Sequence, residues 1–234
     1  ECTPCSPGMY CDSTALTEPT AQCWERYYCV SGVDQPNPLM LNDSQCPADT
    51  VHPILGHICP AGHYCPTGTI FPQGCDAGTY NDLTGQFECR PCPAGYYCYS
   101  NTTDYTPNIC PSGHFCPLGT TDPQEFACPN GTFNNHTGQD DLQDCEPCSP
   151  GMYCEGSGNT HPTGPCDEGW FCTEGSLDKQ PTANGGQCQP GEFCPEGSAA
   201  PQNCTAGFYC DVPGLAATAG SCQAGSYCPT GSSS

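Results

Sequence analysis

Cysteine is the residue type in this sequence that could do the most chemistry. Three pairs are separated by two residues, at Cys2–Cys5, Cys89–Cys92 and Cys145–Cys148. Thiolates at this spacing bind zinc in structural sites, and at the start of a helix they carry out thiol–disulfide exchange. We favour neither chemistry, because each pair is part of a longer cysteine array and no strand–helix–strand pattern surrounds it. We therefore expect no bound metal and no cofactor.

Histidine and acidic side chains are the other candidates for a reactive or metal-binding site. Histidines lie scattered at positions 52, 57, 63, 114, 136 and 161, and two of them fill a slot that Tyr96, Met9 and Trp170 fill elsewhere. No nucleophile elbow, phosphate loop or Ser/His/Asp order is found. We interpret the acidic run from Asp140 to Glu146 as a solvated loop, with weak calcium binding as the minority alternative. The chain is therefore expected not to be an enzyme.

Composition indicates a chain that is held together by covalent cross-links. Apolar residues occupy 35% of the 234 positions, and this class includes 26 cysteines. The 28 glycines and 27 prolines favour turns over regular elements. Little remains to build an ordinary hydrophobic core, so disulfides must supply the stability. Because disulfides persist only in an oxidising space, the sequence predicts an extracellular protein, secreted or at the cell surface.

Charge excludes one further class of function, and the lack of a long apolar run excludes another. The formal net charge is −22, and only Arg26, Arg90 and Lys179 are basic. Nucleic acid binding needs a basic surface, so we exclude it. No apolar run approaches the roughly 18–20 residues that cross a bilayer, so we expect no membrane insertion. We interpret the acidity as a means of keeping a glycoprotein soluble, and the alternative is attraction of calcium or of a basic partner.

Five tripeptides have the Asn-x-Ser/Thr pattern of N-glycosylation acceptors. They begin at Asn42, Asn101, Asn130, Asn135 and Asn203. A cysteine occupies the middle position of the last one, which makes Asn203 the poorest acceptor. Together these sites predict N-linked glycans, and O-linked sugars are compatible with the composition.

Internal repetition is the strongest signal in the sequence. The spacing C-x5-C occurs ten times, and nine copies read C-x-x-G-x-[YF]-C. The exception, Cys23 to Cys29, has Arg26 at the glycine position. Several copies continue into Pro-x-Gly-Ser/Thr. The glycine fits a turn with positive φ, and the aromatic residue then starts a short strand and can pack on a neighbouring disulfide.

A larger unit contains these copies. The spacing C-x2-C-x5-C-x11-C-x5-C runs from Cys2 to Cys29, from Cys89 to Cys116 and from Cys145 to Cys172. We therefore predict small disulfide-rich repeats of short β-hairpins and irregular chain with almost no helix, stacked head to tail into a rod or solenoid. The expected divisions are 1–45 (incomplete at its N-terminal side), 46–74 (atypical), 75–127, 128–187 and 188–234 (short C-x5-C repeats, C-terminally incomplete).

The spacing leaves two disulfide schemes open. In the interlaced scheme, Cys92 pairs with Cys110 and Cys98 with Cys116. In the local scheme, each C-x5-C closes on itself. Both schemes pair Cys75 with Cys89 and Cys128 with Cys145. The cysteines assigned to disulfides are Cys75, Cys89, Cys92, Cys98, Cys110, Cys116, Cys128, Cys145, Cys148, Cys154, Cys166 and Cys172.

These motifs resemble the ephrin-receptor-like and EGF-like cysteine-rich repeats of large extracellular proteins. The resemblance rests on Cys75-Asp-Ala-Gly-Thr-Tyr, Thr84-Gly85 and Cys89-Arg-Pro-Cys92-Pro-Ala-Gly-Tyr-Tyr-Cys98, and it extends as a class of repeat over nearly the whole chain. Arrays of such units are similar to the EGF-like proteins of flagellar hairs, the mastigonemes. The interlaced scheme also looks like the tumour-necrosis-factor-receptor module. The acidic pair of calcium-binding EGF repeats is matched only faintly, by Asp140 and Asp141.

The expected function is that of a structural extracellular glycoprotein that self-assembles into a filament or surface coat, with a mastigoneme-like hair as its most specific form. The alternative is a receptor or adhesin ectodomain that binds a protein ligand. Copies of the chain itself, arranged head to tail or laterally, are the expected partners. Neither end of the sequence shows the atypical polar repeat that caps a solenoid, so we expect either a longer native chain or a neighbouring copy.

Overall fold

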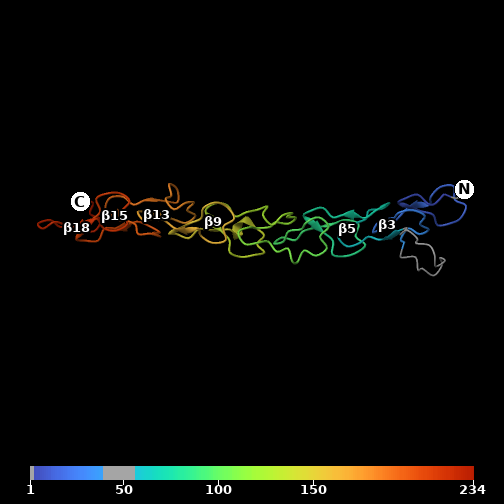
Figure 1. Cartoon of the computed structure of the whole chain (residues 1–234), viewed down its shortest axis with the longest axis horizontal. Coiled ribbons are helices and arrows are strands. Elements are labelled where there is room, and N and C mark those ends of the chain that lie inside the picture. Colours follow the sequence, from blue (N-terminus) through green and yellow to red (C-terminus); the bar gives the residue numbers. More distant parts are fainter. Residues whose placement is uncertain (1–2, 39–55) are drawn as a thin grey trace, which may run out of the picture. The chain divides into compact units, whose positions relative to one another are not determined.

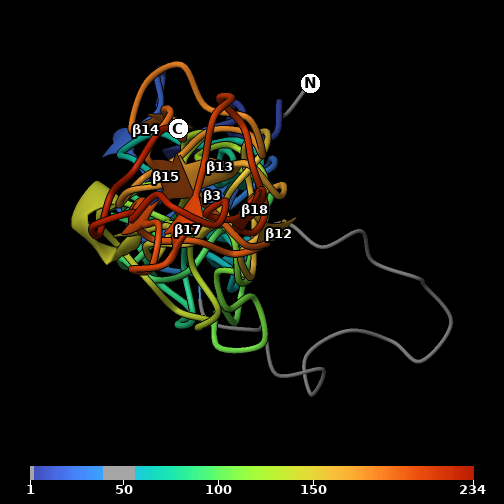
Figure 2. The same cartoon turned by 90° about the vertical axis from the view of Figure 1, so that its left-hand side faces the viewer.

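The computed structural model describes residues 3–38 and 56–234, and the regular elements within them are short (Figure 1). In this described part, eighteen strands of two or three residues pair into nine antiparallel hairpins. Its single helical element is the 3-10 turn η1 (Leu142–Asp144), the yellow coiled ribbon in Figure 2. The expected class of small disulfide-rich repeats with short hairpins and almost no helix is confirmed.

The described residues divide into two compact units. The first comprises Glu1–Ile109 with Pro117–Asp122, and the second comprises Cys110–Cys116 with Pro123–Ser234. Hairpins of the first unit are β1 (Met9–Tyr10) with β2 (Ala21–Gln22), β3 (Tyr27–Cys29) with β4 (Gly56–Ile58), β5 (His63–Tyr64) with β6 (Gln73–Gly74), and β7 (Thr79–Tyr80) with β8 (Arg90–Pro91). Hairpins of the second are β9 (Thr132–Phe133) with β10 (Glu146–Pro147), β11 (Met152–Tyr153) with β12 (Gly164–Pro165), β13 (Trp170–Cys172) with β14 (Gly185–Gln187), β15 (Glu192–Phe193) with β16 (Gln202–Asn203), and β17 (Phe208–Tyr209) with β18 (Gly220–Ser221).

A four-residue turn explains the glycine of the repeat motif. In the Cys92–Cys98 repeat, the amide of Tyr96 donates to the carbonyl of Pro93 at 3.2 Å, and Gly95 between them has a φ of +81°. Glycine takes this conformation without steric cost. Arg26 occupies the same place in the exceptional repeat and also has a positive φ, of 78°. The turn geometry is therefore kept even where the glycine is replaced.

Disulfide pairing is local throughout the described residues, in which every cysteine is bonded. Ten bridges close a C-x5-C spacing, as Cys5–Cys11, Cys23–Cys29, Cys59–Cys65, Cys92–Cys98, Cys110–Cys116, Cys148–Cys154, Cys166–Cys172, Cys188–Cys194, Cys204–Cys210 and Cys222–Cys228. Cys75–Cys89 and Cys128–Cys145 close the two longer loops. The interlaced scheme is thus wrong, because the glycine turn folds Cys92 back to 5.8 Å from Cys98 between Cα atoms, within the span of a disulfide.

Half-cystines make up almost all of the buried apolar core. Among the described residues, the other buried apolar side chains are those of Val33, Tyr80, Pro38 and Pro181. Tyr10 packs against Val33 and the Cys23–Cys29 bridge of the next repeat. In the same way, Tyr80 clusters with the Cys92–Cys98 bridge that follows it. In these two repeats, the aromatic residue shields the disulfide of its neighbour, which is the packing that we expected from the motif.

Candidate functional site: the contacts between repeats

One set of four backbone hydrogen bonds joins neighbouring repeats within each unit. Between the Cys148–Cys154 and Cys166–Cys172 repeats, the amide of Gly151 donates to the carbonyl of Cys172 at 2.8 Å, and Cys166 donates to the carbonyl of Gly151 at 3.0 Å. Beyond the second repeat, the amide of Gly175 donates to Cys148 at 2.9 Å, and Cys154 donates to Ser176 at 3.0 Å. The turn glycine and both cysteines of each bridge therefore bind the next repeat through their backbones.

This set recurs at the following pair of repeats with little change. The amide of Gly169 donates to Cys194 at 2.7 Å, and Cys188 donates to Gly169 at 3.0 Å. Gly197 donates to Cys166 at 2.9 Å, and Cys172 donates to Ser198 at 2.9 Å. Because these bonds use backbone atoms, the side chains between the motif positions are free to vary.

The turn glycine also makes a contact with the second repeat along the chain. A Cβ atom on Gly151 would lie 2.4 Å from the carbonyl oxygen of Gly197, which is closer than real Cβ atoms approach. Equivalent close approaches occur for Gly8 on Gly68, Gly78 on Gly119, Gly113 on Gly158 and Gly169 on Gly214. At these five positions, glycine is therefore favoured for two reasons, the positive φ and the close packing of the backbone.

The Pro-x-Gly-Ser/Thr tail of the motif forms a second turn that presents the contacted carbonyl. Gly197 has a φ of +75°, and the hydroxyl of Ser198 donates to the carbonyl of Pro195 at 2.6 Å. The hydroxyl of Thr120 likewise donates to Pro117 at 2.7 Å, and both hydroxyl residues are buried. This tail, noted in the sequence without a role, therefore belongs to the inter-repeat contact.

Two buried asparagines replace closing cysteines, and sequence reasoning missed them. In the two longer loops, the residue six positions after the first cysteine is Asn81 or Asn134, which are 0% and 2% exposed. The amide of Asn81 donates to the carbonyls of His63 at 2.9 Å and Glu88 at 3.1 Å. Since Cys75 bonds with Cys89 instead, the asparagine side chain holds the site by hydrogen bonds. The signal was present as a C-x5-N spacing.

Replacement of Asn81 by aspartate is expected to destabilise the first unit by at least about 3 kcal/mol at pH 7, because a buried carboxylate would face two carbonyl oxygens. Burial would raise the pKa of the new carboxyl, since it disfavours the charged form. The cost should then be smallest below about pH 4, where the acid is protonated in both folded and unfolded chains, should grow as pH rises from there to the raised pKa, and should be constant above it.

Chemical denaturation of Asn81→Asp and wild type at each pH measures this effect. Asn135→Asp is the matched control in protein made without glycans, because Asn135 is exposed and carries the same substitution. An equal, pH-independent loss in both variants would show that Asn81 does not hold the site by donating hydrogen bonds.

The predicted glycosylation sites are spread over both units. Asn101, Asn130, Asn135 and Asn203 are exposed, whereas Asn42 lies outside the described residues. Asn130 lies in the turn of its repeat, and Asn203 ends β16 beside the bonded Cys204. Solvent therefore reaches four of the five candidate acceptors. The four described acceptors lie in three different repeats.

The acidic run beside η1 binds its own backbone. The carboxylate of Asp144 accepts hydrogen bonds from the amides of Asp140 and Asp141 at 3.1 and 3.0 Å, and Asp141 accepts from Gln143 at 2.9 Å. These bonds cap the 3-10 turn. Within residues 3–38 and 56–234, no three acidic, histidine or cysteine side chains gather as a metal site would require.

No protein-family model matches this chain, and no curated protein is similar to it. The geometry of the repeats therefore carries the functional argument. In the described repeats, the backbones of the motif glycines and cysteines bind neighbouring repeats, and some of the motif aromatic residues pack on a neighbouring disulfide. Many disulfides indicate an extracellular or secreted protein. Among the described helices, none has the length and apolar character that a membrane crossing requires.

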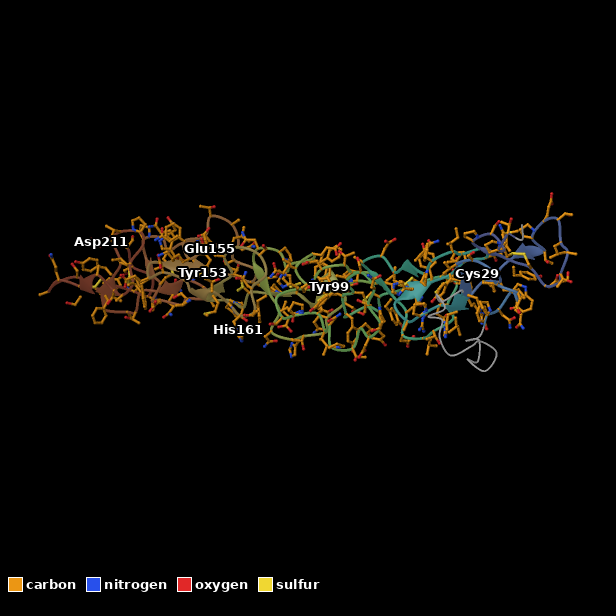
Figure 3. All side chains as sticks on the ribbon, turned by 45° about the vertical axis from the view of Figure 1, so that its right-hand side comes forward. Cys29, Tyr99, Tyr153, Glu155, His161 and Asp211 are labelled. Atoms are coloured by element: carbon orange, nitrogen blue, oxygen red, sulfur yellow. A yellow bond between two sulfur atoms is a disulfide. The ribbon has the colours of Figure 1, made fainter. Side chains whose placement is uncertain are left out.

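The three basic side chains leave most of the negative charge unbalanced. Arg90 forms an ion pair with Asp82 and lies 4.9 Å from the centre of the Tyr80 ring. Lys179 approaches Asp167 to 3.3 Å. Arg26 lies over the ring of Phe87 at 5.8 Å. Side chains tipped with oxygen and nitrogen stand along the ribbon in Figure 3. The surface is thus acidic and polar, with isolated apolar side chains.

Proposed function

We propose that this chain is a structural extracellular glycoprotein that self-assembles into a filament or a surface coat. One observation supports the proposal above all others, which is that the motif residues bind the neighbouring repeats and leave no repeated reactive group. A chain whose repeated positions serve cross-links and packing is suited to bear mechanical load or to keep other molecules at a fixed distance. A hair like the mastigonemes of flagella is the most specific form, by the resemblance of the repeats.

Exposed apolar side chains offer contacts for lateral association between copies. Tyr227, Leu118 and Phe71 are 89%, 67% and 66% exposed. Such rings and side chains gain stability when a second chain removes them from water. A net charge of −22 on each copy opposes this approach, and salt shortens the range of the repulsion from about 30 Å at 0.01 M to about 8 Å at 0.15 M.

Self-association should therefore increase with ionic strength, which light scattering and electron microscopy of the native protein can measure. We expect fibres or sheets of regular repeat at 0.15 M salt and smaller particles at low salt. Tyr227→Asp should weaken association more than Ser226→Asp, because both add one charge at exposed neighbouring positions and only the first removes an apolar ring. A monomeric mass at every salt concentration would refute self-assembly.

Glycans are expected on at least three of Asn42, Asn101, Asn130, Asn135 and Asn203. Exposure of the last four supports this expectation, because an attached sugar chain needs room in solvent. Intact mass before and after glycosidase treatment measures the occupancy in protein from a secretory host. An unchanged mass would mean that the acidity alone keeps the chain in solution.

A ligand-binding ectodomain is the second candidate, and a shallow depression in the first unit favours it. Trp24, Glu25, Arg26, Tyr27 and Thr67 line this depression. Trp24 is 56% exposed. The guanidinium of Arg26 in the same depression forms no ion pair with a described residue. Aromatic and arginine side chains together are typical of protein-binding surfaces. Monodisperse short particles in the electron microscope, without fibres, would favour this function over assembly.

A further inference from the structure

A tight turn brings an exposed tyrosine close to one of the candidate glycosylation sites. The amide of Thr102 donates to the carbonyl of Tyr99 at 3.3 Å, and its hydroxyl donates to the same oxygen at 2.7 Å. Asn101 is the third residue of this turn and has a φ of 62°. A turn of this kind holds its first and fourth Cα atoms within about 7 Å of one another. Tyr99 and Asn101 are the first and third residues of this one turn.

The ring of Tyr99 is both open to solvent and braced from one side. Tyr99 is 51% exposed, and its ring meets that of Tyr97 edge-on, with 5.3 Å between ring centres. Partial desolvation, and after it Tyr97 and Asp122, raises the pKa of Tyr99. Tyr99 is labelled on the green part of the ribbon in Figure 3. The braced, half-exposed ring offers an apolar face on which a sugar can pack.

The terminal amide of Asn101 packs against the backbone of β6. A Cβ atom on Gly74 would overlap the Oδ1 atom of Asn101 and would lie 3.5 Å from its Nδ2 atom, to which a glycan would be attached. The residue as a whole is nevertheless exposed. The first sugar of a glycan on Asn101 would thus start from an anchored side chain, which lowers the entropy lost when the sugar packs on the protein.

We propose that the first N-acetylglucosamine of a glycan on Asn101 packs on the exposed face of Tyr99, which makes this tyrosine a positioning residue for the glycan. The C–H groups on one face of the sugar meet the negative face of the aromatic ring. Burial of both faces then stabilises the turn. The inference deepens the proposed glycoprotein function and rests on it.

Other described sequons lack this arrangement. The residue two positions before Asn130 is the buried Cys128, and before Asn203 it is Pro201. Phe133 precedes Asn135 at the same distance, but it is half-buried within β9 and pairs with Glu146. Among these four acceptors, Asn101 alone has an aromatic ring that is at least half exposed two positions before it.

Hydroxyl-radical labelling of Tyr99 in protein from a secretory host tests the contact. Three forms are compared: the glycosylated chain, the chain trimmed by endoglycosidase to its first sugar, and Thr103→Val. The last variant loses the hydroxyl that the Asn-x-Ser/Thr pattern requires, but it keeps the methyl group that lies near Gly62. We expect labelling of Tyr99 to fall several-fold in both glycosylated forms relative to Thr103→Val. Tyr227, which is 89% exposed and has no sequon beside it, is the internal reference.

A second measurement separates a positioning role from simple shielding. The glycan should raise the melting temperature of the first unit by about 4 °C, the shift that roughly 1 kcal/mol produces in a domain of this size. Tyr99→Phe should keep this shift, and Tyr99→Ser should lose it. Equal labelling of Tyr99 in all three forms, with Asn101 occupied in the two glycosylated forms, would overturn the inference, as would a shift that survives in Tyr99→Ser.

Site-specific mass analysis distinguishes failure of the inference from failure of the proposed function. An empty Asn101 beside occupied Asn130 or Asn135 would overturn the inference and leave the glycoprotein proposal standing. Absence of sugar at every sequon would overturn both.

Discussion

Gly151→Ala is expected to destabilise its unit by about 2–5 kcal/mol, whereas Gly207→Ala costs only about 1–2 kcal/mol. The two glycines occupy the same turn position, with φ values of +84° and +89°, so alanine meets the same backbone strain at both. Their surroundings differ. A Cβ atom on Gly151 would lie 2.4 Å from the carbonyl oxygen of Gly197, whereas one on Gly207 would meet nothing within 4 Å. The difference between the variants therefore isolates the close packing of backbones from different repeats.

Native-state hydrogen exchange is the suitable measurement, because a chain of repeats need not unfold in one step. In Gly151→Ala, we expect faster exchange at the amides of Gly151 and Cys166, which form inter-repeat hydrogen bonds. Gly207→Ala should leave these amides unchanged. Equal destabilisation by the two substitutions would show that the glycine is required for its φ alone.

Reduction of the disulfides is expected to unfold both units at room temperature. By the chain-entropy account, closing a loop of about seven residues contributes about 2.4 kcal/mol, and the two longer loops contribute about 3 kcal/mol each. A few such bridges equal the net stability of an ordinary domain, which is roughly 5–15 kcal/mol. Apart from half-cystines, the described chain buries little apolar surface that could compensate.

The measurement compares near-ultraviolet circular dichroism and amide exchange with and without a strong reductant at neutral pH. A thiol count under denaturing conditions, before reduction, checks that the described cysteines are bonded. Reoxidised protein is the control, because its recovery shows that the loss came from the disulfides. A reduced chain that keeps its slow-exchanging amides would mean that the backbone hydrogen bonds between repeats suffice for folding.

Much of the local structure follows from the motif itself. Glycine at the fourth position of C-x-x-G-x-[YF]-C predicts a turn with positive φ, and Gly95 has it. The low apolar content and the many turn residues predict short hairpins without helices, and the strands have two or three residues. These features depend on residues that lie close together in the sequence, so composition and spacing suffice to predict them.

Disulfide connectivity could not be derived in the same way. Both schemes fit the spacing, because the spacing alone allows Cys98 to pair with Cys92 or with Cys116. The structure decides for the local scheme, since the turn brings Cys92 and Cys98 to 5.8 Å. Asn81 was missed for a related reason. Its burial can be predicted only once it is known that Asn81 stands where the other repeats have their second cysteine.

The sequence by itself determined the class of protein, the cross-linked hairpin repeat, the acidic surface and the candidate glycan acceptors. Tertiary structure alone decided how the repeats bind one another. Gly151 bonds with Cys172 and packs on Gly197, which lie 21 and 46 positions away in the chain. These contacts use backbone amides and carbonyls, which every residue carries, so no side-chain pattern marks their register. A glycine in the sequence indicates only that another part of the chain can approach closely, and the tertiary structure identifies that part.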